Sequence, residues 1–223
     1  ILINSVDDDI VDGNVKSKVT LKMTSADANF NNVTKEIEFT TVDDDVAGFV
    51  ISSNAASFPE SSGATTSMSV ALQSQPTANV TVTVASTDAS ELSVTSATTL
   101  TFTPSNWKTP QNVTAKVVDD NIADGTQTAA IKFTAASTDT NFNGITGQSA
   151  LYTIIDDDAP SLSLAADPTT ISQGSPTSTA SIALGVEPTS DVTITLTSDL
   201  KAVTFKPATL TFTSKNYNTP QKA

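Results

Sequence analysis

Short runs of alternating apolar and polar residues recur about every ten residues along this chain. The clearest lies at residues 79–84, where Val80, Val82 and Val84 alternate with Asn and Thr, and residues 67–72 follow the same pattern. A period of two places the apolar side chains on one face of a β-strand. Such runs, separated by turns rich in Pro and Gly, predict antiparallel β-sandwiches of about seven strands, with almost no helix.

The sequence repeats itself at an interval of about 112 residues. Gln75–Thr77 returns as Glu187–Thr189, and Asn29–Asn31 returns as Asn141–Asn143. On this spacing, residues 1–45 form the C-terminal part of one module, 46–158 a complete module, and 159–223 the N-terminal part of a third. The predicted fold is therefore all-β: tandem immunoglobulin-like antiparallel sandwiches, each of about 112 residues.

The composition narrows the classes of function. The net charge of −13 and a pI near 4.1 disfavour nucleic acid and anionic membranes as partners. Cys and His are both absent, which removes thiolate and imidazole chemistry and leaves oxygen atoms as metal ligands. We expect no enzymatic activity. Because no membrane-length apolar run and no leader pattern occur, we also expect no membrane insertion and a mature or internal segment.

Acidic residues concentrate in four short segments, which contain 13 of the 24 Asp and Glu residues. Two of these segments begin loops that end in Gly13 and Gly125, and the other two are Asp triplets at the module ends. Carboxylates crowded at fixed intervals predict a hard cation among them, and Ca²⁺ takes six to eight oxygen ligands. The candidate ligands are Asp7, Asp8, Asp12, Asp43, Asp44, Asp45, Glu60, Asp88, Asp119, Asp120, Asp124, Asp156, Asp157 and Asp158.

These motifs resemble those of tandem Calx-beta domains, which are sandwich modules found in the sodium–calcium exchanger and in large bacterial surface proteins. The resemblance rests on Glu60, on the loop from Asp119 to Gly125 and on Asp156–Asp158. It implies calcium at the tip of each sandwich, beside the following domain. Two positions depart from the pattern: Asp124 stands where Glu is usual, and the third module has Gln173 where the second has Glu60.

Each of these features also has a plainer interpretation. An acidic run is commonly a solvated surface, and Asp88 is a residue type that favours turns through its own hydrogen bonds. Trp107 and Tyr217 occupy equivalent positions in the repeat. Packing is the favoured role for both, with a sugar-binding platform as the alternative.

The expected function is that of a secreted or cell-surface structural protein. Its modules would act as calcium-stiffened spacers or would form a fibre, with residues 159–223 meeting residues 1–45 head to tail. The partner would be either a flanking module of the same chain or a separate copy. The alternative is an adhesin that binds a carbohydrate or protein ligand.

Overall fold

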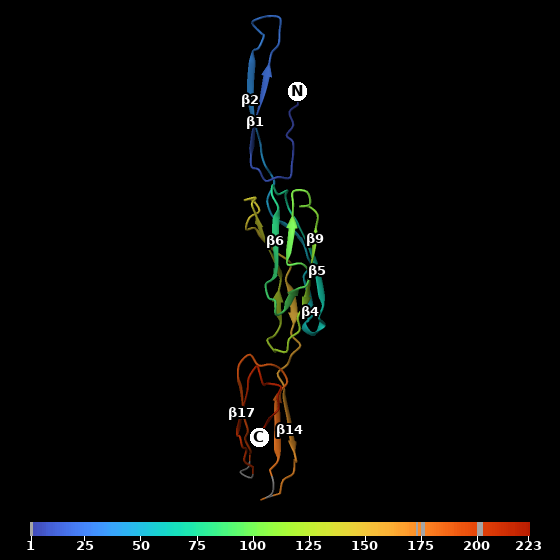
Figure 1. Ribbon diagram of the computed structural model, residues 1–223, viewed down its shortest axis with the longest axis vertical. Helices are drawn as coiled ribbons and strands as arrows, with labels where there is room; N and C mark the ends of the chain where they lie inside the picture. The colour runs from blue at the N-terminus through green and yellow to red at the C-terminus, as the bar shows by residue number, and fades with distance from the viewer. Residues whose placement is uncertain (1, 173, 175–176, 200–202) are drawn as a thin grey trace.

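The computed structural model describes residues 2–172, 174, 177–199 and 203–223. They form three parts that follow one another along the long axis of the molecule (Figure 1). Strands make up nearly all the regular structure, and the 3-10 turn η1 (Glu60–Ser62) is the one helical segment in the described part of the chain. The all-β prediction is confirmed. No helix within the described ranges has the length and hydropathy needed to span a membrane.

The N-terminal part (residues 2–45) contains one hairpin, formed by β1 (Val15–Lys22) and β2 (Thr34–Thr41). The strands pair antiparallel, with Val15 opposite Thr41 and Lys22 opposite Thr34. One face carries charged side chains, including the exposed pair Lys16–Glu38 at 3.1 Å. Since residues alternate between faces, the opposite face carries the apolar side chains.

The central sandwich (residues 46–158) contains three sheets. The first has the strand order β3-β5-β9-β7, with bounds Phe49–Ser52, Thr65–Leu72, Gln111–Val117 and Leu92–Val94. The second has the order β12-β11-β6-β8, with bounds Thr146–Gln148, Ile131–Ser137, Val80–Ser86 and Thr99–Phe102. The third has the order β10-β13-β4, with bounds Gln127–Ala129, Tyr152–Ile155 and Ala56–Pro59.

These sheets enclose a single hydrophobic core. In β6 the valines at 80, 82 and 84 are buried while the threonines between them are exposed, as the alternation predicts. Phe133, Phe142 and Tyr152 are fully buried, and Trp107 is only 8% exposed and belongs to the same core. The packing role predicted for Trp107 is therefore confirmed. Burial of each large apolar side chain contributes about 1.5–3 kcal/mol.

The expectation of about seven strands is too low for the central sandwich. Residues 46–158, all of which are described, contain eleven strand segments, β3 to β13. The difference arises because long strands break where they pass from one sheet to another. For example, β10 pairs with β13 and β11 pairs with β6, although only Ala130 separates β10 from β11.

The C-terminal part (residues 159–223) contains a smaller set of strands. β14 (Leu162–Asp167), β15 (Thr179–Leu184) and β18 (Gln221–Lys222) form one sheet, and β16 (Val192–Thr195) pairs with β17 (Thr209–Phe212). Ile182, Leu210 and Phe212 are its buried core residues. This core is much smaller than that of the central sandwich.

Candidate metal centre

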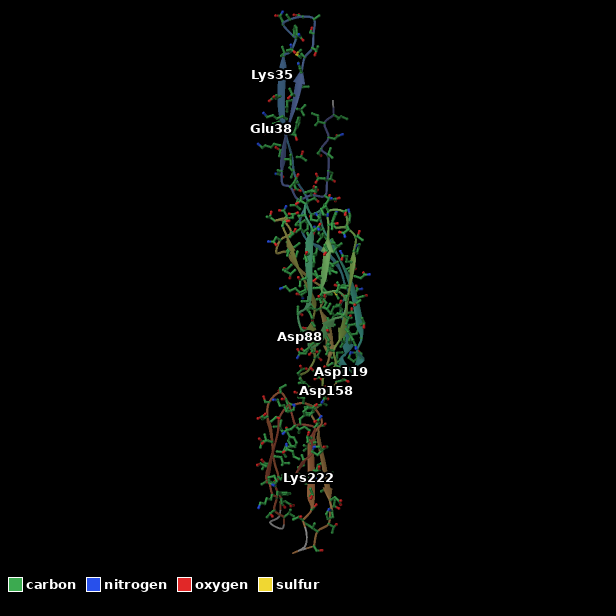
Figure 2. The ribbon with its side chains drawn as sticks, viewed as in Figure 1. Lys35, Glu38, Asp88, Asp119, Asp158 and Lys222 are labelled. Carbon is green, nitrogen blue, oxygen red and sulfur yellow. The ribbon has the colours of Figure 1, made fainter. Side chains whose placement is uncertain are left out.

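Three strand ends bring acidic residues to one end of the central sandwich. β4 and β13 run parallel, so Glu60, which follows β4, lies at the same end as Asp156–Asp158, which follow β13. The loop that begins at Val118 follows β9, whose Lys116 pairs with Thr65 at the start of β5. Figure 2 shows Asp88, Asp119 and Asp158 at this end, beside the C-terminal part.

Hydrogen bonds tie the three segments together. Glu60 Oε1 accepts the backbone N–H of Asp120 at 2.9 Å, and Asp157 Oδ1 accepts that of Ser61 at 3.2 Å. Asp156 Oδ2 accepts the N–H of Gly125 at 2.7 Å. Gly125 has φ +84° with no atom near its hypothetical Cβ, so backbone conformation explains the glycine here.

Glu60 and Asp158 both lie in an environment that disfavours negative charge. Burial is the main cause of the raised pKa of Glu60, which is 2% exposed, and the charges of Asp120, Asp156 and Asp124 add to it. The N–H of Asp120 offsets part of this effect. For Asp158, burial again raises the pKa most. Repulsion from Asp156 and Asp157, and then from Asp119 and Asp120 in the loop after β9, raises it further.

Glu91 belongs to this cluster and was not among the predicted ligands. It directly precedes β7, is 3% exposed, and has its pKa raised to about 7 by burial and then by the charges of Glu60, Asp124, Asp88 and Asp120. No repeat marks it, because the repeat spacing places its counterpart in the third module within residues 201–203, none of which is acidic. The one available signal was an isolated acidic residue at the start of an apolar strand.

The predicted ligands of the central sandwich are thus brought together by the fold. Apart from Asp158 itself, each of them is a charge that raises the pKa of Glu60, Glu91 or Asp158. Asp88 also has the local role of a turn residue, because its Oδ1 accepts hydrogen bonds from the N–H and hydroxyl of Ser90. Its role as a ligand stays a prediction. Gln173 lies outside the described residues.

A second acidic cluster lies between the N-terminal part and the central sandwich. Burial raises the pKa of Asp45, and the charges of Asp43, Asp44, Asp9 and Asp7 raise it further. By contrast, N–H donors from Asp45, Gly13 and Asp12 lower the pKa of Asp43. Asp8 accepts the N–H of Ile10 at 2.9 Å. The predicted ligands Asp7, Asp8, Asp12, Asp43, Asp44 and Asp45 therefore lie along two neighbouring segments.

Equivalent hydrogen bonds occur in the two clusters, between residues that correspond in the sequence repeat. Asp43 Oδ2 accepts from Gly13 at 2.6 Å, as Asp156 Oδ2 accepts from Gly125 at 2.7 Å. The bond from Asp45 N–H to Asp43, at 2.9 Å, matches that from Asp158 N–H to Asp156, at 2.8 Å. Similar sequence therefore gives the same local geometry in both places.

Each acidic loop also contacts the part of the chain that follows it. The N–H of Gln75 donates to the carbonyl of Asp9 at 2.6 Å, and the N–H of Glu187 donates to that of Asn121 at 2.7 Å. Parallel bridges join Ile10 to Gln75 and Ile122 to Glu187. The acidic loops are therefore also contact surfaces between successive parts.

The donor set suits a hard cation, because it consists of carboxylate oxygens whose mutual repulsion a cation would relieve. In the described ranges, however, no three acidic side chains stand in an arrangement that would hold an ion as they are placed. Several carboxylates instead accept backbone N–H groups. Chelation of an ion would require these side chains to turn toward one another.

Comparison with known proteins identifies no family. No family model and no curated protein matches this chain. Among solved structures, a chaperone–tip adhesin complex of CFA/I fimbriae has a TM-score of 0.35 at 12% identity, covering 78% of this chain and 82% of that chain. The CsuC–CsuE chaperone–tip subunit complex of Acinetobacter baumannii has a TM-score of 0.32 at 10% identity, covering 79% and 90%.

The YadV chaperone has a TM-score of 0.33 at 8% identity, covering 78% of this chain and 83% of that chain. All three scores lie below 0.5, so nothing about the partners or activity of this chain follows from them. The resemblance to Calx-beta domains stays a prediction.

Proposed function

We propose that this chain is a non-enzymatic structural protein of the cell surface or extracellular space, built from tandem sandwich modules that Ca²⁺ stiffens at their junctions. The observation that carries the proposal is the convergence of Glu60, Glu91 and the predicted aspartates at the end of the central sandwich that faces the next part. Two of these carboxylates are almost fully buried. A cation there would supply the positive charge that offsets their repulsion.

The ligands would come from the loop after β9, from the triplet after β13, and from the buried residues Glu60 and Glu91. The same loop holds the next part through Asn121, whose carbonyl accepts the N–H of Glu187 and whose Nδ2 donates to the hydroxyl of Tyr217 at 2.9 Å. An ion that fixes the loop would therefore also fix this contact. Stiffening of the junction is the expected mechanical consequence.

A second element of the proposal is head-to-tail completion of the two terminal parts, through flanking modules of one chain or through separate copies. It is supported by the exposed apolar side chains of the hairpin, among them Leu21, Phe30 and Ile37. Sheets with such faces normally pack against another element.

The test of the calcium proposal is thermal unfolding followed by the fluorescence of Trp107, the one Trp in the chain. A native state that binds Ca²⁺ gains about 2.7 kcal/mol at a concentration about a hundredfold above Kd. The melting temperature should therefore fall on chelation at matched ionic strength. Small-angle scattering of the same samples should show a narrower distribution of lengths with calcium.

Asp119→Asn and Glu36→Gln form a matched pair for this experiment. Each removes one negative charge, but Asp119 belongs to the cluster while Glu36 lies in the hairpin. Asp119→Asn should raise stability without calcium, because repulsion falls, and should reduce the gain on adding calcium. Glu36→Gln removes only an exposed ion pair with Lys18 at 3.5 Å and should leave the response to calcium unchanged. An unchanged melting curve between calcium and chelator would refute the calcium proposal.

A further inference from the structure

Three connections between strands meet at the end of the central sandwich that faces the N-terminal part (Figure 1). β6 begins at Val80, which is opposite Phe102 of β8 and Ser137 of β11. Both β8 and β11 end at these residues, so the connections that follow them lie beside the one that precedes β6. This surface is called the three-loop end below, and its connections are residues 73–79, 103–110 and 138–145.

Hydrogen bonds fasten the three connections to one another. In the loop between β11 and β12, the Asp139 carboxylate accepts the N–H and the hydroxyl of Thr77 at 2.8 and 2.9 Å. It also accepts the N–H of Asn141 at 3.0 Å. The side-chain amide of Gln75 donates to the carbonyl of Pro104 at 2.8 Å. Because these bonds link all three connections, the surface that they form is organised before anything binds to it.

The three-loop end holds the acidic loop of the N-terminal part by its main chain. The N–H of Gln75 donates to the carbonyl of Asp9 at 2.6 Å, and Nδ2 of Asn141 donates to the carbonyl of Val11 at 2.8 Å. Ile10, between these two residues, forms a parallel bridge with Gln75. Carbonyls two residues apart point to the same side of an extended segment. Both donors therefore bind one edge of the loop.

The charge of Asp9 contributes little to this contact. Its Oδ1 lies 4.0 Å from Nζ of Lys108, and both side chains are more than half exposed. An ion pair of this kind adds little stability. At the other junction, Asn121 corresponds to Asp9 in the repeat, and its carbonyl accepts the N–H of Glu187 at 2.7 Å although its side chain is neutral. The same main-chain contact therefore forms with either residue.

We infer that the three-loop end is a docking site for the acidic loop of the preceding module, and that it recognises the main-chain carbonyls of that loop and not its charge. The partner is thus a short extended segment at the end of another sandwich module. Recognition through the main chain leaves the carboxylates of the loop available to a cation. The inference rests on the tandem-module part of the proposed function and does not require calcium.

The test is hydrogen exchange of the Gln75 amide, followed by NMR in the 223-residue chain with calcium and with chelator. This amide exchanges when the contact with Asp9 opens. Asn141→Ala removes the donor to Val11 and should accelerate exchange at Gln75 by about two- to tenfold. The amide of Glu187, which makes the equivalent contact at the other junction, should exchange at an unchanged rate.

Two further variants serve as controls. Asn143 is exposed and lies in the same connection as Asn141, but its Oδ1 accepts the N–H of Ser137 within the central sandwich, at 3.3 Å. Asn143→Ala should therefore leave exchange at Gln75 unchanged. Asp9→Asn keeps the carbonyl and removes the charge, so it should alter the exchange rate by about twofold at most.

Acceleration at Gln75 by Asn141→Ala alone, in calcium and in chelator alike, supports the inference. Equal acceleration by Asp9→Asn would mean that the site recognises charge, and equal acceleration by Asn143→Ala would mean that the loop itself had changed; either result overturns it. An unchanged rate in Asn141→Ala overturns the docking role, and protection of Gln75 in calcium alone overturns the independence from calcium. The melting experiment decides the calcium proposal separately, so the two failures are distinguishable.

Discussion

The hairpin and the central sandwich contain the same structural unit in two different states. The strand pairs correspond along the repeat: Val15 is opposite Thr41 in the hairpin, as Gln127 is opposite Ile154 in the sandwich. In the sandwich, however, the pairing is divided between two sheets, one with β10 and β13 and the other with β11 and β12. Burial differs completely, because Phe142 is 0% exposed and its counterpart Phe30 is 52% exposed.

This difference separates what a sequence determines locally from what it determines only with a partner. Pairing in the hairpin follows from the alternation of residues in two strands that are adjacent in sequence and joined by the connection Met23–Val33, and these features are local. Burial requires β4 and β6, which come from the other half of a module. An identical pattern therefore gives a core in one region and an exposed face in the other.

The largest effect that can test this contrast is truncation of the two matched phenylalanines. Phe142→Ala should destabilise the central sandwich by about 3–5 kcal/mol, because it removes a buried ring and leaves a cavity. Phe30→Ala should change the stability of the dilute, monomeric chain by less than about 0.5 kcal/mol. Denaturant unfolding followed by Trp107 fluorescence measures both.

Repeating the measurement at a high protein concentration serves as the control for association between copies. If copies complete one another, Phe30→Ala should weaken assembly at high concentration while leaving the dilute unfolding curve unchanged. Equal destabilisation by the two substitutions in dilute solution would mean that Phe30 is already buried, and the contrast between the two regions would be wrong.

Much of the fold could be predicted because alternation and repeat spacing are local signals. The alternation predicts strands at residues 79–84 and 67–72, which correspond to β6 and β5. The number of strand segments could not be predicted, because the break at Ala130 depends on which sheet each half joins. That choice depends on partners distant in sequence, and no short pattern encodes it.

The acidic cluster shows the same limit. Residues such as Asp120 and Asp156 could be predicted because they recur beside glycines and at strand ends. Glu91 could not, since it stands alone and its importance comes from its burial near Glu60, which is distant in sequence. The N-terminal cluster offers no comparison for Glu60 or Glu91, because residues 1–45 align only with the part of the central sandwich that follows β9.

The pH dependence of stability should sharpen this comparison between clusters. The pKa of Glu91 is raised to about 7 in the folded state, from 4.5 in the unfolded chain. The protonated form therefore favours folding: its contribution is fully present below pH 4.5 and is lost as the pH rises through 7. Calcium-free protein should unfold at a higher temperature at pH 5 than at pH 8, with at most about 3 kcal/mol from Glu91.

Glu91→Gln supplies the control, because it keeps the shape and removes the charge. The variant should be more stable than the parent at pH 8 and should lose most of the pH dependence between 5 and 8. Calcium should also flatten the profile of the parent, since a cation favours the ionised carboxylate. A variant with the same slope as the parent would show that Glu91 is not the titrating group.

The smallest effect expected concerns Asp139 and its counterpart Asp27, which differ in their hydrogen bonds. Asp139 is 7% exposed and accepts from Thr77 twice and from Asn141, whereas the carboxylate of exposed Asp27 accepts from Asn29. Asp139→Ala should cost about 1–3 kcal/mol, because it leaves buried donors without an acceptor. Asp27→Ala should cost less than about 0.5 kcal/mol in the monomer.

The stability of the Asp139 variant in acid tests whether the ionised carboxylate makes these hydrogen bonds. Burial alone would raise the pKa of Asp139, but the donors from Thr77 and Asn141 outweigh it and lower the pKa below 3.8. The stability that Asp139 contributes is therefore present above pH 3.8 and is lost as the pH falls through the folded pKa. The parent and Asp139→Ala should therefore converge in strongly acidic solution. A gap for Asp139→Ala that does not narrow in acid would mean that the ionised carboxylate is not what fastens this loop to the turn at Thr77.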